Sequence, residues 1–309
     1  MMALALGAVA GGVHLRANAR ERAAEQEFPP LGQFVTVDGV RIHAVVTGSG
    51  PDLVLIHGAS GNLRDFTFDL VPQLARDFRV IAFDRPGLGW SDPAPDGHLL
   101  ARQADLLHRA AVALGADRPL VLGQSYGGAV ALNWALTHPD AVAGLITVSA
   151  PSHPWPTGLP TLYRVTSHPL GQALAVPLIT ALVPDSYLQN AVDGAFDPQD
   201  PPQGYASHFG PALSARRQTL RSNADQRAAL KDEIRAMSTD YGRITVPVEM
   251  LHGTADDVVD FNLHALQLLR DLPDAHLTRL PGIGHMPHHA AQGAVLAAIH
   301  RAATRAGLR

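Results

Sequence analysis

The sequence contains no cysteine. This absence excludes a disulfide framework, a zinc site built on thiolates and a cysteine nucleophile. Basic residues are not in excess either, because 24 lysines and arginines stand against 28 aspartates and glutamates, for a net charge of −4. A chain with this balance lacks the basic surface that holds a phosphate backbone, so we expect no nucleic-acid partner.

Long apolar runs are also lacking. The N-terminal stretch, residues 1–13, is apolar and uncharged, but it is shorter than the ~20 residues that span a bilayer. Arg16, Arg20 and Arg22 follow it, whereas a secretory signal carries its positive charge first. This order keeps the following domain on the cytoplasmic side. We therefore expect a cytoplasmic protein in which residues 1–13 form either a helix docked ahead of the domain or a weak membrane tether.

The composition is that of a globular protein, with 46% hydrophobic residues, 17% charged residues and a mean hydropathy of +0.04. Its 309 residues suit two units or one large α/β domain with an insertion. We predict an N-terminal segment and polar linker over residues 1–30, a first part of the core over 31–150, a helical lid over 151–243 and a second part of the core over 244–309. The linker proper covers residues 23–30, so the folded domain should begin near Leu31.

Short apolar runs of the kind that parallel sheets bury on both faces recur along the chain. The Asp38-Gly39 pair is a hairpin turn signal between the first two runs. We expect eight strands, at residues 34–37, 40–46, 53–56, 80–83, 120–122, 145–148, 248–251 and 276–280.

Stretches with helical spacing separate most of these strands, at residues 63–78, 99–114, 127–137, 261–272 and 290–306. Such alternation predicts an α/β fold, a mostly parallel eight-stranded sheet with helices on both faces. Between strands six and seven the chain carries only helical pieces, such as residues 217–237, and proline-rich turns. We interpret this insertion as a helical lid.

The chemistry begins at Gly123-Gln124-Ser125-Tyr126-Gly127, which follows an expected strand and opens an expected helix. This is the setting of a nucleophile elbow, a strained turn that presents a serine hydroxyl at the carboxyl edge of the sheet. The flanking glycines remove Cβ atoms that would collide with the neighbouring strand and helix. Ser125 is therefore our candidate nucleophile.

A serine nucleophile needs a base and an acid that orients the base. Asp256 comes just after the strand at 248–251, and His285 comes just after the strand at 276–280. Loops at the carboxyl ends of parallel strands meet at one edge, so all three residues can converge. Asp257 is the rival acid, although its neighbour fits the tight turn after the strand better.

On these residues the chain resembles the α/β-hydrolase fold superfamily, in its lidded branch of esterases, lipases, carbon–carbon bond hydrolases and perhydrolases. The resemblance covers nearly all of residues 31–305 and is weakest in the lid. It implies Ser125 as nucleophile, Asp256 as acid and His285 as general base. Aspartate stands at the elbow of haloalkane dehalogenases and epoxide hydrolases, so Ser125 argues against both.

The resemblance also implies an oxyanion hole made of two backbone N–H groups. The family's His-Gly signature falls on His57-Gly58, so one donor would be the amide of Ala59, and the other that of Tyr126. The run from Asp84 to Ser91 matches the family's Asp-x-x-Gly-x-Gly-x-Ser pattern, and we interpret it as structural.

No metal or organic cofactor is expected. The chain has 16 histidines. Three of them, His285, His288 and His289, could suggest a metal site, but their spacing matches no standard zinc pattern. Gly87-Leu88-Gly89 lacks the third glycine and the following helix of a dinucleotide fingerprint.

The lid is the part of the sequence that bears on substrate. Some of its aromatic residues should line an apolar pocket over Ser125; these residues are Trp155, Tyr163, Tyr187, Phe196, Tyr205 and Phe209. We predict a serine hydrolase whose partner is a small-molecule ester or similar carbonyl substrate with an apolar portion. A carbon–carbon bond hydrolase or perhydrolase with the same triad, and a low-turnover binding protein on the same fold, are the alternatives.

Overall fold

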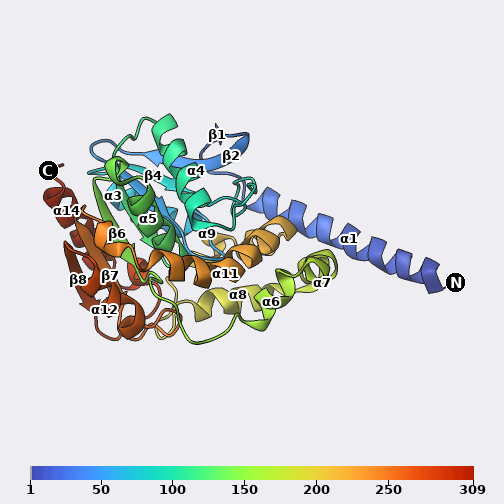
Figure 1. The fold of residues 1–309 in the computed structure, drawn as a ribbon. Helices are drawn as coiled ribbons and strands as arrows, with labels where there is room; N and C mark the ends of the chain where they lie inside the picture. Colours follow the sequence, from blue (N-terminus) through green and yellow to red (C-terminus); the bar gives the residue numbers. More distant parts are fainter. Residues whose placement is uncertain (1) are drawn as a thin grey trace.

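A single mixed sheet forms the centre of the molecule in a computed structural model that describes residues 2–309, with side chains from residue 7 onward (Figure 1). The strand order is β1-β2-β4-β3-β5-β6-β7-β8. The strands are β1 (Gln33–Val37), β2 (Val40–Thr47), β3 (Asp52–Ile56), β4 (Arg79–Phe83), β5 (Leu120–Gln124), β6 (Gly144–Val148), β7 (Val248–Gly253) and β8 (Ala275–Leu280). Only β2 runs antiparallel to its neighbours, which confirms the predicted eight-stranded α/β sheet.

Helices cover both faces of this sheet because side chains alternate along each strand. In β3, Val54 and Ile56 join one apolar cluster, which α4 (Leu100–Ala113), α5 (Tyr126–Thr137) and α12 (Phe261–Asp271) complete. Leu53 and Leu55 join the other, which α3 (Leu70–Leu74) and α14 (Gln292–Arg305) complete. The helices expected at these places are confirmed, except that residues 63–78 form two short helices, α2 (Arg64–Thr67) and α3, rather than one.

The insertion between β6 and β7 contains helices and loops but no strand within the described residues. It contains α6 (Thr161–Thr166), α7 (Pro169–Leu182), α8 (Asp185–Gly194), α9 (Tyr205–Phe209), α10 (Pro211–Ser214) and α11 (Arg217–Met237). A short 3₁₀ turn, η2 (Tyr241–Arg243), leads back to the sheet, and two further short elements lie outside the insertion, η1 (Pro139–Ala141) and α13 (Pro287–Ala290). In Figure 1, α6, α7 and α8 lie together, with α11 between them and the body of the molecule.

The predicted linker over residues 23–30 is wrong. Helix α1 (Met2–Glu27) continues through most of it, and Ala24 and Phe28 are buried against Leu213 of α10. Good helix formers such as Ala, Glu and Gln favour continuation of the helix, and side chains of the insertion hold it, with Arg217 paired to Glu21 at 2.6 Å. The packed part of the chain therefore begins well before Leu31.

The first part of α1 extends past the helices of the insertion and away from the body of the molecule (Figure 1). Its second half packs along α7 and α10. No helix within residues 2–309 has both the length and the apolar character to cross a membrane.

Candidate active site

Ser125 occupies the sharp turn between β5 and α5. Its backbone has φ = 50° and ψ = −124°, a region that costs a non-glycine residue free energy. The turn is tight: a Cβ on Gly127 would lie 2.1 Å from the Ile56 carbonyl oxygen, and one on Gly123 would lie 2.2 Å from the Gly127 carbonyl oxygen. The two glycines of the motif are therefore required by backbone contacts, as the sequence suggested.

The structure brings Ser125, His285 and Asp256 together at the carboxyl edge of the sheet. The Oγ of Ser125 lies 2.9 Å from Nε2 of His285, and Nδ1 of His285 lies 2.9 Å from Oδ2 of Asp256. All three side chains are buried. Asp257, the rival acid, is exposed and does not contact His285 within the described residues.

Asp256 is held as a carboxylate. Its Oδ1 accepts hydrogen bonds from the amides of Val258 and Val259, at 3.0 and 2.9 Å. Burial works to raise the pKa of Asp256, but hydrogen bonds from His252 and His285 outweigh it and hold the pKa far below its usual range. An ionised Asp256 requires a proton on Nδ1 of His285, which leaves Nε2 free to accept the proton of Ser125.

Ala59 and Tyr126 are the two residues expected to donate the oxyanion amides, and Tyr126 directly follows Ser125. Ala59 lines the same cavity as Ser125, and Tyr126 is the first residue of α5, where a backbone N–H has no partner inside the helix. The carbonyl of Gly58 accepts from Nη2 of Arg85 and from Nδ1 of His57, each at 2.9 Å. Because a peptide unit is planar and trans, these bonds turn the Ala59 N–H the opposite way.

Arg85 stabilises the loop that contains His57, Gly58 and Ala59 through hydrogen bonds. It is fully buried and donates to the carbonyls of His57 and Gly58 and to the side chains of Gln103 and Gln226. No carboxylate within the described residues lies within ion-pair distance of it, and burial lowers its pKa to about 10. Sequence reasoning assigned the run from Asp84 to Ser91 to loop shape alone and did not single out Arg85.

His57 is neutral at the base of the same loop. Its Nε2 accepts the amide N–H of Arg85 at 2.9 Å, so its proton resides on Nδ1. Burial, with the nearby positive charge of Arg85, lowers the pKa of His57 to about 4.

A cavity of ≈ 700 Å³ opens over Ser125 and His285. Its walls are mostly aliphatic and aromatic and come from the insertion; they include Leu178, Ile179, Leu182, Leu188 and Val192. Some of the six aromatics of the insertion were expected at the pocket, and five of them line it, namely Tyr163, Tyr187, Phe196, Tyr205 and Phe209, whereas Trp155 does not.

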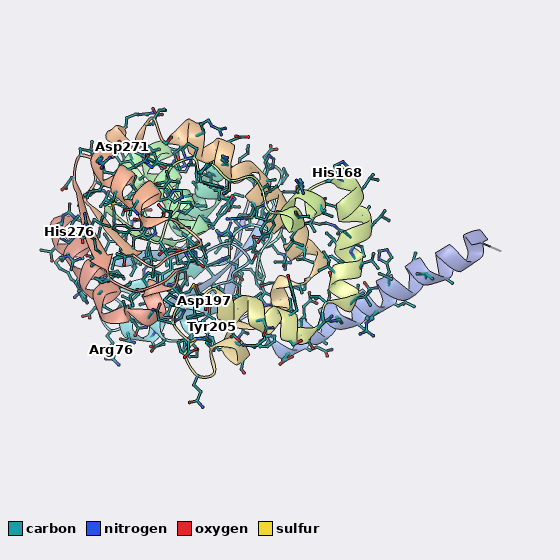
Figure 2. All side chains as sticks on the ribbon, turned by 90° about the horizontal axis from the view of Figure 1, so that it is seen from below. Arg76, His168, Asp197, Tyr205, Asp271 and His276 are labelled. Atoms are coloured by element: carbon teal, nitrogen blue, oxygen red, sulfur yellow. The ribbon has the colours of Figure 1, made fainter. Side chains whose placement is uncertain are left out.

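The segment between α8 and α9 also holds the loop of His285. The Gln199 side chain donates to the Gly282 carbonyl at 2.8 Å and accepts from the Gly284 amide at 2.9 Å. A Cβ on Gly284 would lie 1.8 Å from the Asp197 carbonyl oxygen. Asp197 and Tyr205 lie close together in the view of Figure 2, where this segment passes the body of the molecule.

Asp65, His288 and His289 form the one group of described residues whose ligand atoms are close enough to share a metal ion. Sequence reasoning noticed the two histidines but not Asp65, which lies 223 residues from His288. The carboxylate is already satisfied, because His288, His289 and the Tyr205 hydroxyl contact it at 3.0, 2.8 and 2.7 Å. These contacts fit a hydrogen-bonded anchor for α9 better than a metal centre.

Comparison with known proteins places the chain among hydrolases. A family model described as alpha/beta hydrolase fold matches residues 51–291. An uncharacterized protein of Mycobacterium tuberculosis is 29% identical over 279 residues, which cover 84% of this chain and 77% of that protein. The 2-hydroxy-6-oxo-6-phenylhexa-2,4-dienoate hydrolase of Burkholderia cepacia is 28% identical over 278 residues, covering 82% and 89%. The structure of an esterase from Rhodococcus sp. is similar with a TM-score of 0.65 and 25% identity, covering 88% and 98%.

Proposed function

Because the chain belongs to the α/β-hydrolase fold family, we propose that it is a serine hydrolase that cleaves a carboxylic ester through an acyl-enzyme. The observation that carries this proposal is the unbroken series of contacts from Ser125 Oγ to His285 Nε2 and from His285 Nδ1 to Asp256, each shortest contact being 2.9 Å. Such a series is what a serine needs to become a nucleophile at neutral pH. The similarity to an esterase supports the same activity.

The proposed reaction uses this geometry. Ser125 Oγ attacks the ester carbonyl carbon while His285 Nε2 takes its proton, and the carbonyl oxygen becomes an oxyanion facing the amides of Ala59 and Tyr126. The tetrahedral intermediate then collapses, and the imidazolium gives its proton to the departing alkoxide. Asp256 keeps the ring oriented and stabilises its charge in both steps. Water repeats the sequence on the acyl-enzyme and releases the acid.

The apolar cavity over Ser125 supports a substrate with an apolar portion. The cavity wall consists largely of leucine, isoleucine and aromatic side chains. An alkyl or aryl group that replaces water against this wall stabilises the complex by about 25 cal/mol per Å² of apolar surface buried. We therefore propose that the substrates are esters with a medium or long hydrocarbon group.

Fluorophosphonate labelling read by intact mass tests the nucleophile. We expect one covalent adduct on the full chain and none on Ser125→Ala, together with turnover of a p-nitrophenyl ester series by the unaltered chain only. A folded protein that forms no adduct would instead favour a binding protein on this fold.

Carbon–carbon bond hydrolysis is the second candidate. It is favoured by the similarity over 82% of this chain to two hydrolases of 2-hydroxy-6-oxo dienoates, at 28% and 27% identity. Both chemistries would use Ser125 and His285, so the labelling experiment does not separate them. Loss of the absorbance of a vinylogous diketone in the presence of the enzyme would separate them, since a simple esterase leaves that chromophore intact.

A cytoplasmic location, with a weak membrane tether through residues 1–13, also stays a proposal. It is supported by the lack of charge in this stretch and by the way α1 extends past the lid (Figure 1). Co-sedimentation with phospholipid vesicles, compared between the full chain and one that lacks residues 2–13, tests it. Equal recovery of both forms in the supernatant would refute the tether.

A further inference from the structure

A second cavity also reaches Ser125. It has a volume of ≈ 730 Å³ and is lined by the segment after β6, by α11 and by the loop between β7 and α12. Ser125 is the one residue that it shares with the apolar cavity. An ester has two arms, one on each side of the carbonyl that a serine attacks. Two cavities that meet at the nucleophile can therefore hold one arm each.

Two cations on α11 face this second cavity. Arg227 and Lys231 stand four residues apart, so they share one side of the helix, and both are half-buried. Lys231 is the single lysine of the sequence. Within residues 7–309, neither side chain has a carboxylate within ion-pair distance.

Their remaining contacts leave both cations available. The Arg227 guanidinium lies 5.3 Å from the centroid of the Tyr163 ring, and its Nε is buried with no hydrogen-bond partner. Lys231 donates one hydrogen bond, to the Thr157 carbonyl at 3.1 Å, and its Nζ lies 6.0 Å from the centroid of the Trp155 ring. Buried donors in proteins almost always have partners, and the Nε of Arg227 is free to donate to an acceptor group.

The acidic residues of this cavity do not neutralise that wall. Asp232, Asp257 and Asp260 are all exposed, where water and salt screen their charge. Asp232 pairs with Arg235, and Asp260 accepts the amide N–H of Leu263 at 2.6 Å as the N-cap of α12. The half-buried part of the cavity wall is therefore positive.

We propose that the second cavity is a subsite for an anionic group of the substrate, a carboxylate or similar oxyanion, bound by Arg227 and Lys231. Guanidinium and ammonium groups that are partly withdrawn from water form strong charge-assisted hydrogen bonds with such groups. The inference rests on the proposed ester hydrolysis and narrows its substrate to an ester with one hydrocarbon arm and one acidic arm.

Two matched pairs of esters test the subsite and decide which arm carries the charge. For the alcohol arm, the octanoate ester of 3-hydroxybenzoate is compared with that of methyl 3-hydroxybenzoate. For the acyl arm, octyl hydrogen glutarate is compared with octyl pentanoate. Each ester is hydrolysed by the unaltered chain, Arg227→Gln, Lys231→Met and, as the matched control, Arg243→Gln, which removes one exposed positive charge remote from both cavities.

We expect KM for the anionic member of one pair to rise by about tenfold to a hundredfold in Arg227→Gln and in Lys231→Met. KM for its neutral partner should stay unchanged, and Arg243→Gln should behave as the unaltered chain for every ester. Equal effects on neutral and anionic esters, or no effect on either anionic ester, would overturn the proposal. If Arg227→Gln does not fold, Lys231→Met decides, because Lys231 makes a single hydrogen bond within the described chain.

Calorimetric titration separates the subsite from the activity. Ser125→Ala is titrated with 3-hydroxybenzoate and with glutarate, alone and combined with Arg227→Gln. Binding of one anion that Arg227→Gln abolishes supports the subsite even if no ester is cleaved, in which case only the proposed hydrolysis fails. If the enzyme hydrolyses neutral esters but binds neither anion, the proposed hydrolase activity is supported and the proposed anion subsite is wrong.

Discussion

The guanidinium of Arg85 donates a hydrogen bond of 2.9 Å to the carbonyl of Gly58, the residue directly before the proposed oxyanion amide of Ala59. In a planar trans peptide the carbonyl and the N–H point in opposite directions, so a bond that fixes the Gly58 carbonyl also fixes the direction of the Ala59 N–H. The Arg85 charge is buried and has no carboxylate partner in the described chain, so its field also reaches the site of the developing oxyanion.

Replacement of Arg85 should therefore impair turnover more than binding. We expect Arg85→Gln to lower kcat by about tenfold to a hundredfold with little change in KM, since a misplaced oxyanion donor costs up to about 10³ in rate. Steady-state kinetics on a p-nitrophenyl ester, together with urea unfolding, measure both quantities. A fall in kcat no larger than the fall in folded fraction would mean that Arg85 only stabilises the fold.

The two neighbouring aspartates after β7 should respond very differently to the same substitution. Asp256→Asn removes the carboxylate that holds the proton on Nδ1 of His285, and we expect kcat to drop by about 10⁴. Asp257→Asn changes an exposed side chain without contact to His285 and should leave kcat on neutral esters unchanged. The paired measurement is kcat of both variants at the same pH. The opposite ranking would make Asp257 the acid.

Much of this arrangement follows from local signals in the sequence. Short apolar runs mark the strands, and all eight strands are found where they were expected, including the partly exposed edge strands β1 and β8. The elbow at Ser125 is recognisable because glycines must stand where the backbones approach within contact distance. Asp256 and His285 are found because parallel strands end at one edge, a rule that needs no knowledge of contacts.

What the sequence did not reveal depends on contacts between distant segments. Asp65 meets His288 across 223 residues, and no spacing rule links two such positions. Arg85 stands within a familiar loop pattern, but its role depends on which carbonyls it reaches. The packing of residues 23–30 was missed because Ala24 and Phe28 are buried by the insertion, whereas these residues have the polar composition of a linker.

Acid should destabilise the fold through two neutral histidines. Burial lowers the pKa of His57 and of His264 to about 4, and each accepts backbone N–H bonds that a second ring proton would break. Between about pH 6.5 and pH 4 these histidines bind protons in the unfolded chain but not in the folded chain. The free energy of unfolding is therefore highest above this window and falls as the pH is lowered through it. Each full shift corresponds to about 3 kcal/mol.

Urea unfolding between about pH 7.5 and pH 4.5 measures this dependence. In His57→Gln the amide oxygen can still accept the Arg85 N–H, but nothing titrates, so we expect a shallower decline of stability with acid. His14→Gln, at an exposed position on α1, serves as the control and should decline like the unaltered chain. Parallel curves for all three proteins would contradict the assignment.

The Tyr205 hydroxyl should stabilise the fold through Asp65. It donates to Oδ1 of Asp65 at 2.7 Å; burial and the adjacent carboxylate raise the pKa of Tyr205 well above its usual value. We expect Tyr205→Phe to lower the free energy of unfolding by about 1.5 to 3 kcal/mol, the range for a hydrogen bond to a charged group. Urea midpoints of Tyr205→Phe and of Tyr187→Phe, whose side chain is 60% exposed, should differ accordingly. Equal midpoints would show that the anchor contributes nothing.

The end of α1 should contribute to stability although it precedes the sheet. Phe28 is 7% exposed and packs with Ala24 and Leu213, and a Cβ on Gly210 would lie 2.7 Å from its ring. Removing a buried phenyl group leaves a cavity, so we expect Phe28→Ala to cost about 3 kcal/mol of unfolding free energy. Leu15→Ala, on a side chain that is 70% exposed, should cost less than about 0.5 kcal/mol. If thermal and urea unfolding find the two variants equally stable, α1 is an appendage and the packed domain begins near Leu31 after all.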